Sequence, residues 1–131
     1  MEGRKKVLVI DDEPDMVEMI SMALDREFEV ITAYNGKEGV HRAQDEKPDA
    51  IVLDIMMPEK DGFAACRELK ADSRTASIPI LILTGVGEYF GRSKYARSSG
   101  LEIEAEDFLA KPVDPQELLR RVQALIAQSQ K

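Results

Sequence analysis

The most constraining feature of the sequence is a short apolar run that ends on a carboxylate. Residues 50–53 read Ala-Ile-Val-Leu, Asp54 follows them, and Pro58 closes the segment. Because successive rather than alternating residues are apolar, the run predicts a strand that is buried on both faces, as in a parallel sheet covered by helices. Asp54 is then expected at the carboxyl end of that strand, where open α/β sheets place their functional groups.

Three other apolar runs end on reactive residue types in the same way. These runs, each with the residues that follow it, are 6–10 with Asp11 and Asp12, 80–83 with Thr84, and 108–110 with Lys111. If the strands lie parallel, their carboxyl ends meet at one edge of the sheet. We therefore expect three carboxylates, one hydroxyl and one ammonium to converge there.

The chain as a whole alternates strand and helix signals. Residues 29–34 predict a further strand, which we place at a sheet edge because it has fewer apolar residues. Expected helices span about 14–26, about 37–45, a segment that turns Phe63, Cys66 and Leu69 inward, 92–99, and a final helix that starts at Pro115 with Asp114 as N-cap. Parallel strands need helical crossovers. Five strands and five helices therefore predict an α/β fold with a doubly wound parallel sheet and helices on both faces.

Composition narrows the class of protein. With 131 residues and 44% hydrophobic content, the chain is long enough to bury one core. The net charge of −7 argues against direct DNA binding, which depends on basic side chains. No apolar run approaches the roughly 20 residues that a bilayer-spanning helix needs. We therefore expect a cytoplasmic protein that binds neither DNA nor membranes.

The converging residues have a chemical interpretation. Crowded carboxylates repel one another, and a hard divalent cation is the usual means of keeping them ionised together. Asp11, Asp12 and Asp54 therefore predict a Mg²⁺ site. A carboxylate beside Mg²⁺ can attack phosphorus and form an aspartyl phosphate, while an ammonium and a hydroxyl stabilise the transferred phosphoryl oxygens. Lys111 and Thr84 have the chemistry for those two positions.

The four motifs resemble the signature stretches of the response-regulator receiver domain of two-component signalling. The resemblance rests on residues 6–12, 49–58, 80–84 and 107–112 in this order, and it covers about residues 5–127. It implies the flavodoxin-like strand order 2-1-3-4-5, which periodicity alone does not determine. Because the sequence stops within a few residues of the final expected helix, we also expect residues 1–131 to form a single receiver domain without an effector domain.

Carried over to this sequence, the resemblance makes Asp54 the phosphoacceptor. It makes Asp12 and Asp54 ligands of Mg²⁺, with Asp11 beside them, and it assigns the remaining protein ligand to the backbone carbonyl of Met56. The expected function is thus a signalling phosphoacceptor that catalyses only its own phosphorylation and dephosphorylation, rather than an enzyme acting on other substrates.

The same resemblance assigns the residues around the acceptor. Lys111 would pair with the acceptor carboxylate or the phosphoryl group, and its bond to Pro112 would be cis. Thr84 would hydrogen-bond a phosphoryl oxygen, and Phe108 would be the aromatic switch that turns inward when Thr84 moves.

The implied partners are proteins. A histidine kinase or a phosphotransfer protein would supply the phosphoryl group, and a downstream protein would read the altered surface. The resemblance also allows a homodimer through the face formed by the expected helix at 92–99, the strand at 108–110 and the final helix.

Two alternatives remain open. An aspartyl-phosphate phosphatase of the haloacid-dehalogenase type shares the parallel sheet and the nucleophilic aspartate. Such enzymes have a second aspartate two residues after the nucleophile, where this chain has Met56. A pseudo-receiver that only binds partners is the other alternative, and the retention of every reactive position speaks against it.

Overall fold

The strands form one parallel sheet in the computed structural model, which describes residues 4–54, 61–85 and 105–129. Their order is β2-β1-β3-β4-β5, which confirms the expected flavodoxin-like arrangement with residues 29–33 in an edge strand. The strands are β1 (Lys5–Ile10), β2 (Phe28–Ala33), β3 (Ala50–Asp54), β4 (Ile80–Thr84) and β5 (Asp107–Ala110). The apolar run that ends on Asp54 is thus the central strand, and all five of its residues are buried.

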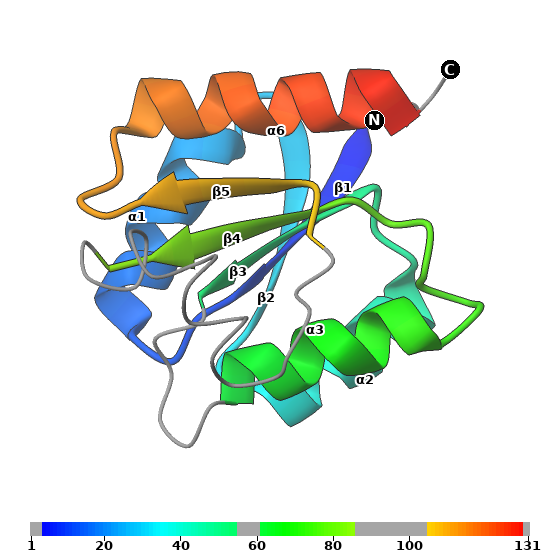
Figure 1. Ribbon diagram of the computed structural model, residues 1–131. Coiled ribbons are helices and arrows are strands. Elements are labelled where there is room, and N and C mark those ends of the chain that lie inside the picture. The colour runs from blue at the N-terminus through cyan, green and yellow to red at the C-terminus, as the bar shows by residue number, and fades with distance from the viewer. Residues whose placement is uncertain (1–3, 55–60, 86–104, 130–131) are drawn as a thin grey trace.

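Helices cover both faces of the sheet, as expected (Figure 1). The helices in the described part of the chain are α1 (Pro14–Leu24), α2 (Gly36–Glu46), α3 (Asp61–Ala71) and α6 (Pro115–Ser129). The helix expected at 92–99 lies outside the described residues. No helix among those described has both the length and the apolar character needed to cross a membrane.

The side chains of β1 alternate between the two faces of the sheet, and both faces need a layer of helices. Leu8 and Ile10 belong to the core under α2 and α3, whereas Val7 and Val9 belong to the core under α1 and α6. Successive side chains of a strand point to opposite faces, so a strand that is apolar at every position must be covered on both. All four of these side chains are fully buried.

Local signals account for the helix starts. Pro14 occupies the first turn of α1, where its missing N–H costs no hydrogen bond. Asn35 caps α2 by accepting from the Glu38 N–H at 2.8 Å, and the Glu38 carboxylate accepts from the Tyr34 N–H at 2.9 Å. These two bonds differ from a capping box only in that the Glu38 carboxylate accepts from the residue before the N-cap, and they fix where the chain leaves β2 and begins α2.

Gly39 in α2 packs directly against Ile10 of β1. A Cβ atom at position 39 would lie 2.4 Å from Ile10 Cδ1 and 2.8 Å from Cγ1, and Ile10 is fully buried. Gly39→Ala is therefore expected to lower the free energy of unfolding by about 1–3 kcal/mol through overpacking. Chemical denaturation would measure the loss, which opposes the gain in helix propensity of at most about 1 kcal/mol that alanine brings.

A second substitution tests whether the loss comes from this contact. Ile10→Val removes Cδ1, the atom closest to the added methyl group, so the double variant should be more stable than the two separate losses predict. Lys37→Ala, at an exposed position of the same helix, is the control for a general effect of alanine in α2. Simple additivity of the two losses would show that the Cδ1 contact does not cause the destabilisation.

Candidate functional site

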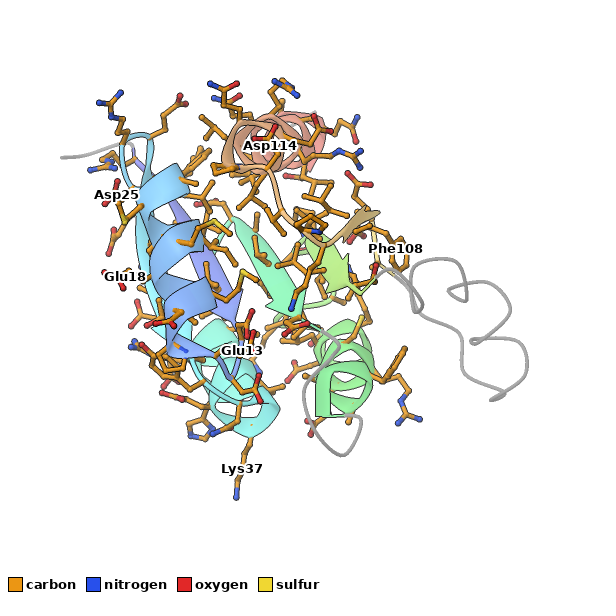
Figure 2. All side chains as sticks on the ribbon, turned by 90° about the vertical axis from the view of Figure 1, so that its left-hand side faces the viewer. Glu13, Glu18, Asp25, Lys37, Phe108 and Asp114 are labelled. Atoms are coloured by element: carbon orange, nitrogen blue, oxygen red, sulfur yellow. The ribbon has the colours of Figure 1, made fainter. Side chains whose placement is uncertain are left out.

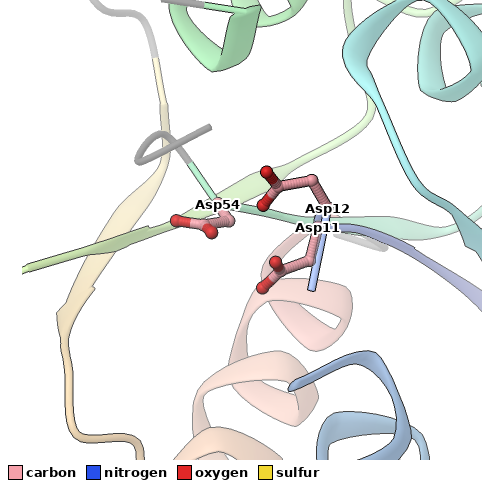
Figure 3. Close-up of side chains that lie close together, drawn as sticks. All are labelled: Asp11, Asp12 and Asp54. Carbon is pink, nitrogen blue, oxygen red and sulfur yellow. The ribbon is translucent and has the colours of Figure 1, made fainter. Parts of the chain in front are cut away.

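Three carboxylates meet at the carboxyl ends of β1 and β3 (Figure 3). Asp11 and Asp12 directly follow β1, and Asp54 is the last residue of β3, which pairs with β1. Each carboxylate offers one oxygen, and these oxygens all lie within 4.8 Å of one another. Asp11 and Asp54 are buried, whereas Asp12 is exposed. The structure therefore brings together the three acidic residues that the sequence places at strand ends.

Lys111 directly follows β5, which β4 separates from β3 in the sheet, and its side chain reaches the same carboxylates. Its Nζ lies 3.1 Å from Asp54 Oδ2, and its backbone N–H donates to the Thr84 carbonyl at 2.7 Å. The expected cis peptide bond to Pro112 is present. One ammonium among three carboxylates leaves a net charge of −2 when all four groups are ionised, as −3 plus 1. This excess of negative charge favours a cation.

Two buried polar atoms in the described residues lack a hydrogen-bond partner, and both belong to expected site residues. They are Asp11 Oδ2 and Thr84 Oγ1. Both residues are fully buried, at the carboxyl ends of β1 and β4. Buried polar atoms are nearly always paired, so two such atoms at one sheet edge indicate a polar ligand there. The oxygen-only set of Asp11, Asp12 and Asp54 fits a hard divalent cation such as Mg²⁺.

Burial also disturbs the ionisation of Asp11. It raises the pKa of this carboxyl from 3.8 to about 7, and the charge of Asp54 acts in the same direction. The Glu13 N–H, which donates to Asp11 Oδ1 at 3.0 Å, and the Lys111 ammonium hold this pKa down. Without a cation the site therefore resists full ionisation near neutral pH.

Phe108 is the second residue of β5 and lies opposite Ile82 of β4, and Figure 2 shows it toward the β5 side of the sheet, away from Glu13. It is partly buried and packs against the core under α2 and α3. Its N–H donates to Asp107 Oδ1 at 2.8 Å, and its carbonyl accepts from Arg121 Nη1 at 3.1 Å. The last site residue expected from the sequence, Met56, lies outside the described residues.

Sequence reasoning missed two contributors near the site. The backbone N–H of Glu13 donates a hydrogen bond to the Asp11 carboxylate. A backbone donor of this kind cannot be predicted from the pattern of side chains in the sequence. The first turn of α1 also lines a surface hollow of about 460 Å³ next to the carboxylates, together with Asp12 and Glu13. Met16 and Met19 contribute apolar surface to it, and both also pack against the core under α1 and α6.

Comparison with known proteins decides the family. A model of the response regulator receiver domain matches residues 7–123, which is most of the chain. The chain belongs to this family. As a receiver domain of two-component response regulators, it is a signalling module rather than a classical enzyme, and this favours the signalling interpretation over the dehalogenase-type phosphatase.

Several curated relatives of this receiver domain are named as transcriptional regulators. The alkaline phosphatase synthesis transcriptional regulatory protein PhoP of Bacillus subtilis is 40% identical over 127 residues, which cover 96% of this chain and 50% of that protein. The DNA-binding dual master transcriptional regulator RpaA of Synechocystis is 38% identical, with 92% of this chain and 48% of that protein covered. The chain thus spans about half the length of these relatives. They lend no support to the expectation that direct DNA binding is absent.

Solved structures agree with the fold. The chemotaxis protein CheY4 of Vibrio cholerae superposes with a TM-score of 0.81 at 30% identity, covering 94% of this chain and 99% of that one. A response regulator receiver domain protein from Clostridium thermocellum gives 0.80 at 30% identity, covering 96% and 97%. Both likenesses extend over nearly the whole of each chain.

Proposed function

We propose that this receiver domain accepts a phosphoryl group on Asp54 in a Mg²⁺-dependent reaction, with a histidine kinase or a phosphotransfer protein as donor. One observation carries the proposal. Asp54 is buried at the end of the central strand, next to two other carboxylates, and the Lys111 ammonium lies 3.1 Å from it. This is the arrangement that a nucleophilic carboxylate needs when the incoming group is itself negatively charged.

The metal ligands are part of the proposal. Asp12 and Asp54 would hold Mg²⁺, with Asp11 beside them, and the backbone carbonyl of Met56 would complete the protein's share. The bound ion would supply the positive charge that keeps the carboxylates ionised and stabilises the phosphoryl oxygens in the transition state. Asp11 Oδ2, which lacks a hydrogen-bond partner within the described part of the chain, and the net negative charge of the cluster support this assignment.

The transfer itself is a displacement at phosphorus. An oxygen of the Asp54 carboxylate forms the new O–P bond while the bond from phosphorus to the donor breaks, and the leaving group takes up a proton. The Lys111 ammonium neutralises phosphoryl oxygens during this step, and the Thr84 hydroxyl, which has no partner in the described residues, donates to one of them.

The output is a change of surface. Thr84 would move toward the phosphoryl group and Phe108 would turn inward behind it, and a downstream protein would bind the altered face. A homodimer through residues 92–99, β5 and α6 is the other form of output that we propose. The single-domain boundary of 1–131 and the cytoplasmic location stay predictions.

The direct test uses acetyl phosphate as the donor. Incubated with Mg²⁺ and acetyl phosphate, the protein should gain one phosphoryl group, which intact-mass spectrometry detects, and an excess of EDTA should prevent the gain. An unchanged mass under both conditions would favour a pseudo-receiver. Multiple turnover of phosphomonoesters to free phosphate would instead favour a phosphatase.

A further inference from the structure

One carboxylate joins β4 and β5 at the end of the sheet opposite to the site. Glu106, directly before β5, accepts from the N–H of Ile80 through Oε1 at 2.8 Å. The backbone N–H of Glu106 donates to the Ile80 carbonyl at 3.0 Å. The N–H and the carbonyl of Ile80, the first residue of β4, are therefore both hydrogen-bonded to Glu106.

Lys70 of α3 holds this carboxylate in place. Its Nζ lies 3.0 and 3.1 Å from the two Glu106 oxygens, and it also donates to the carbonyls of Ala76 at 3.2 Å and Ile78 at 2.9 Å. An ammonium has three N–H donors, and the Glu106 carboxylate together with the two carbonyl groups uses all of them. The Lys70 side chain is only 9% exposed, compared with 43% for Glu106. A nearly buried ammonium requires its partners, which fixes the position of Glu106.

The strand that Glu106 introduces depends on such a support. β5 has four residues, and among the strands that the structure describes it pairs only with β4, in a register that runs from Leu81 opposite Asp107 to Thr84 opposite Ala110. A slip by one residue would shift the strand by about 3.3 Å and turn its side chains to the other face. Lys111 follows β5 directly, so the register decides whether its ammonium reaches Asp54.

A second carboxylate joins β3 to β1 by the same pattern of two hydrogen bonds. Asp49, directly before β3, accepts from the Lys6 N–H through Oδ2 at 2.8 Å, and its own N–H donates to the Lys6 carbonyl at 2.8 Å. β3 carries Asp54 at its other end, just as β5 leads to Lys111. The two strands that place the acceptor and its ammonium are thus both fixed at their amino ends by a carboxylate.

We propose that Glu106, held by Lys70, is a positioning residue that sets the register of β5 and thereby places Lys111 against Asp54. The consequence for phosphoryl transfer rests on the proposed function, whereas the placement of Lys111 does not. Two separate readouts keep these apart. Acetylation of Lys111 by acetic anhydride, mapped on peptides, reports its pairing, and the initial rate of phosphoryl gain from acetyl phosphate reports its effect on transfer.

Four variants define the experiment. Glu106→Ala removes the carboxylate, whereas Glu106→Gln keeps an oxygen that can accept from Ile80. Lys70→Met removes the ammonium and keeps an apolar stem of similar length. Asp72→Ala is the matched control, because Asp72 also accepts a backbone N–H, that of Arg74 at 2.8 Å, and forms an ion pair, but it has no bond to β5.

In Glu106→Ala we expect faster acetylation of Lys111 and a phosphoryl gain about tenfold slower, because small misplacements of a catalytic group are costly. Lys70→Met should show the same two changes to a smaller degree, and Glu106→Gln should stay close to the parent protein. Asp72→Ala should leave both readouts unchanged even where its melting temperature falls. All measurements are made at a temperature at which circular dichroism shows each variant folded.

The outcomes separate the two proposals. Unchanged acetylation of Lys111 in the folded Glu106→Ala or Lys70→Met variant would overturn the positioning role. Equal changes in Asp72→Ala would also overturn it, because they would show a general loss of stability. If the parent protein gains no phosphoryl group, the proposed function fails, and the acetylation comparison still decides whether Glu106 positions Lys111.

Discussion

Asp54→Asn is expected to abolish the gain of a phosphoryl group from acetyl phosphate in the presence of Mg²⁺. Asparagine keeps the shape of the side chain but replaces the nucleophilic carboxylate oxygen by a neutral amide, which does not attack phosphorus. Asp54 is the carboxylate of the cluster that forms an ion pair with the Lys111 ammonium, at 3.1 Å, and it is the last residue of the central strand β3. Intact-mass spectrometry of the parent and the variant, treated side by side, measures the effect.

Two controls make this result specific. Asp72→Asn changes a remote, ion-paired carboxylate and should leave the phosphoryl gain intact. Asp12→Asn keeps the acceptor but removes a proposed Mg²⁺ ligand, so it should slow the reaction and raise the Mg²⁺ concentration required. A phosphoryl group that still appears in Asp54→Asn, located elsewhere by peptide mapping, would show that Asp54 is not the acceptor.

Asp11→Asn is expected to stabilise the metal-free protein, and more so as the pH rises. The pKa of Asp11 is raised from 3.8 to about 7 in the folded protein, mainly by burial. Between these values the unfolded chain has released the proton and the folded protein still holds it, so stability falls as the pH rises. Asparagine does not titrate. The advantage of the variant in free energy of unfolding should therefore grow by about 2 kcal/mol between roughly pH 5 and pH 7, and then level off.

Chemical denaturation in EDTA at several pH values measures this difference. Asp72→Asn is the matched control, because Arg74 lowers the pKa of Asp72 to about 2, and Asp72 is therefore ionised in both states over this range. Its effect on stability should not change between these pH values. Added Mg²⁺ should stabilise the parent more than Asp11→Asn, since a ligand stabilises the state that binds it. An advantage of Asp11→Asn that is independent of pH would contradict the raised pKa.

The sequence by itself determined the elements and their reactive ends. The uninterrupted apolar residues of β3 require burial on both faces, and the structure buries all of them. The inward positions expected for the third helix, Phe63, Cys66 and Leu69, are also buried. Such features follow from local periodicity, because side chains at i and i+2 of a strand, or i and i+3 of a helix, share a face whatever lies opposite.

Strand boundaries show the limit of that local argument. The pattern places the second strand at residues 29–34, whereas β2 is Phe28–Ala33. Phe28 is buried against the α1 and α6 layer, and Tyr34 is 45% exposed. Both are aromatic and equally compatible with a strand, so only the position of the neighbouring helices decides which one is inside.

The tertiary structure alone decided how the reactive ends are combined. That Lys111 meets Asp54 at 3.1 Å depends on two strand pairings, β3 with β4 and β4 with β5, between segments far apart in the chain. The raised pKa of Asp11 comes mainly from its burial in the folded protein. The contact of Lys70 with Glu106 joins residues 36 positions apart. Local sequence sets which groups each strand end carries. The distances and desolvation that give those groups their chemistry arise only when distant segments pack.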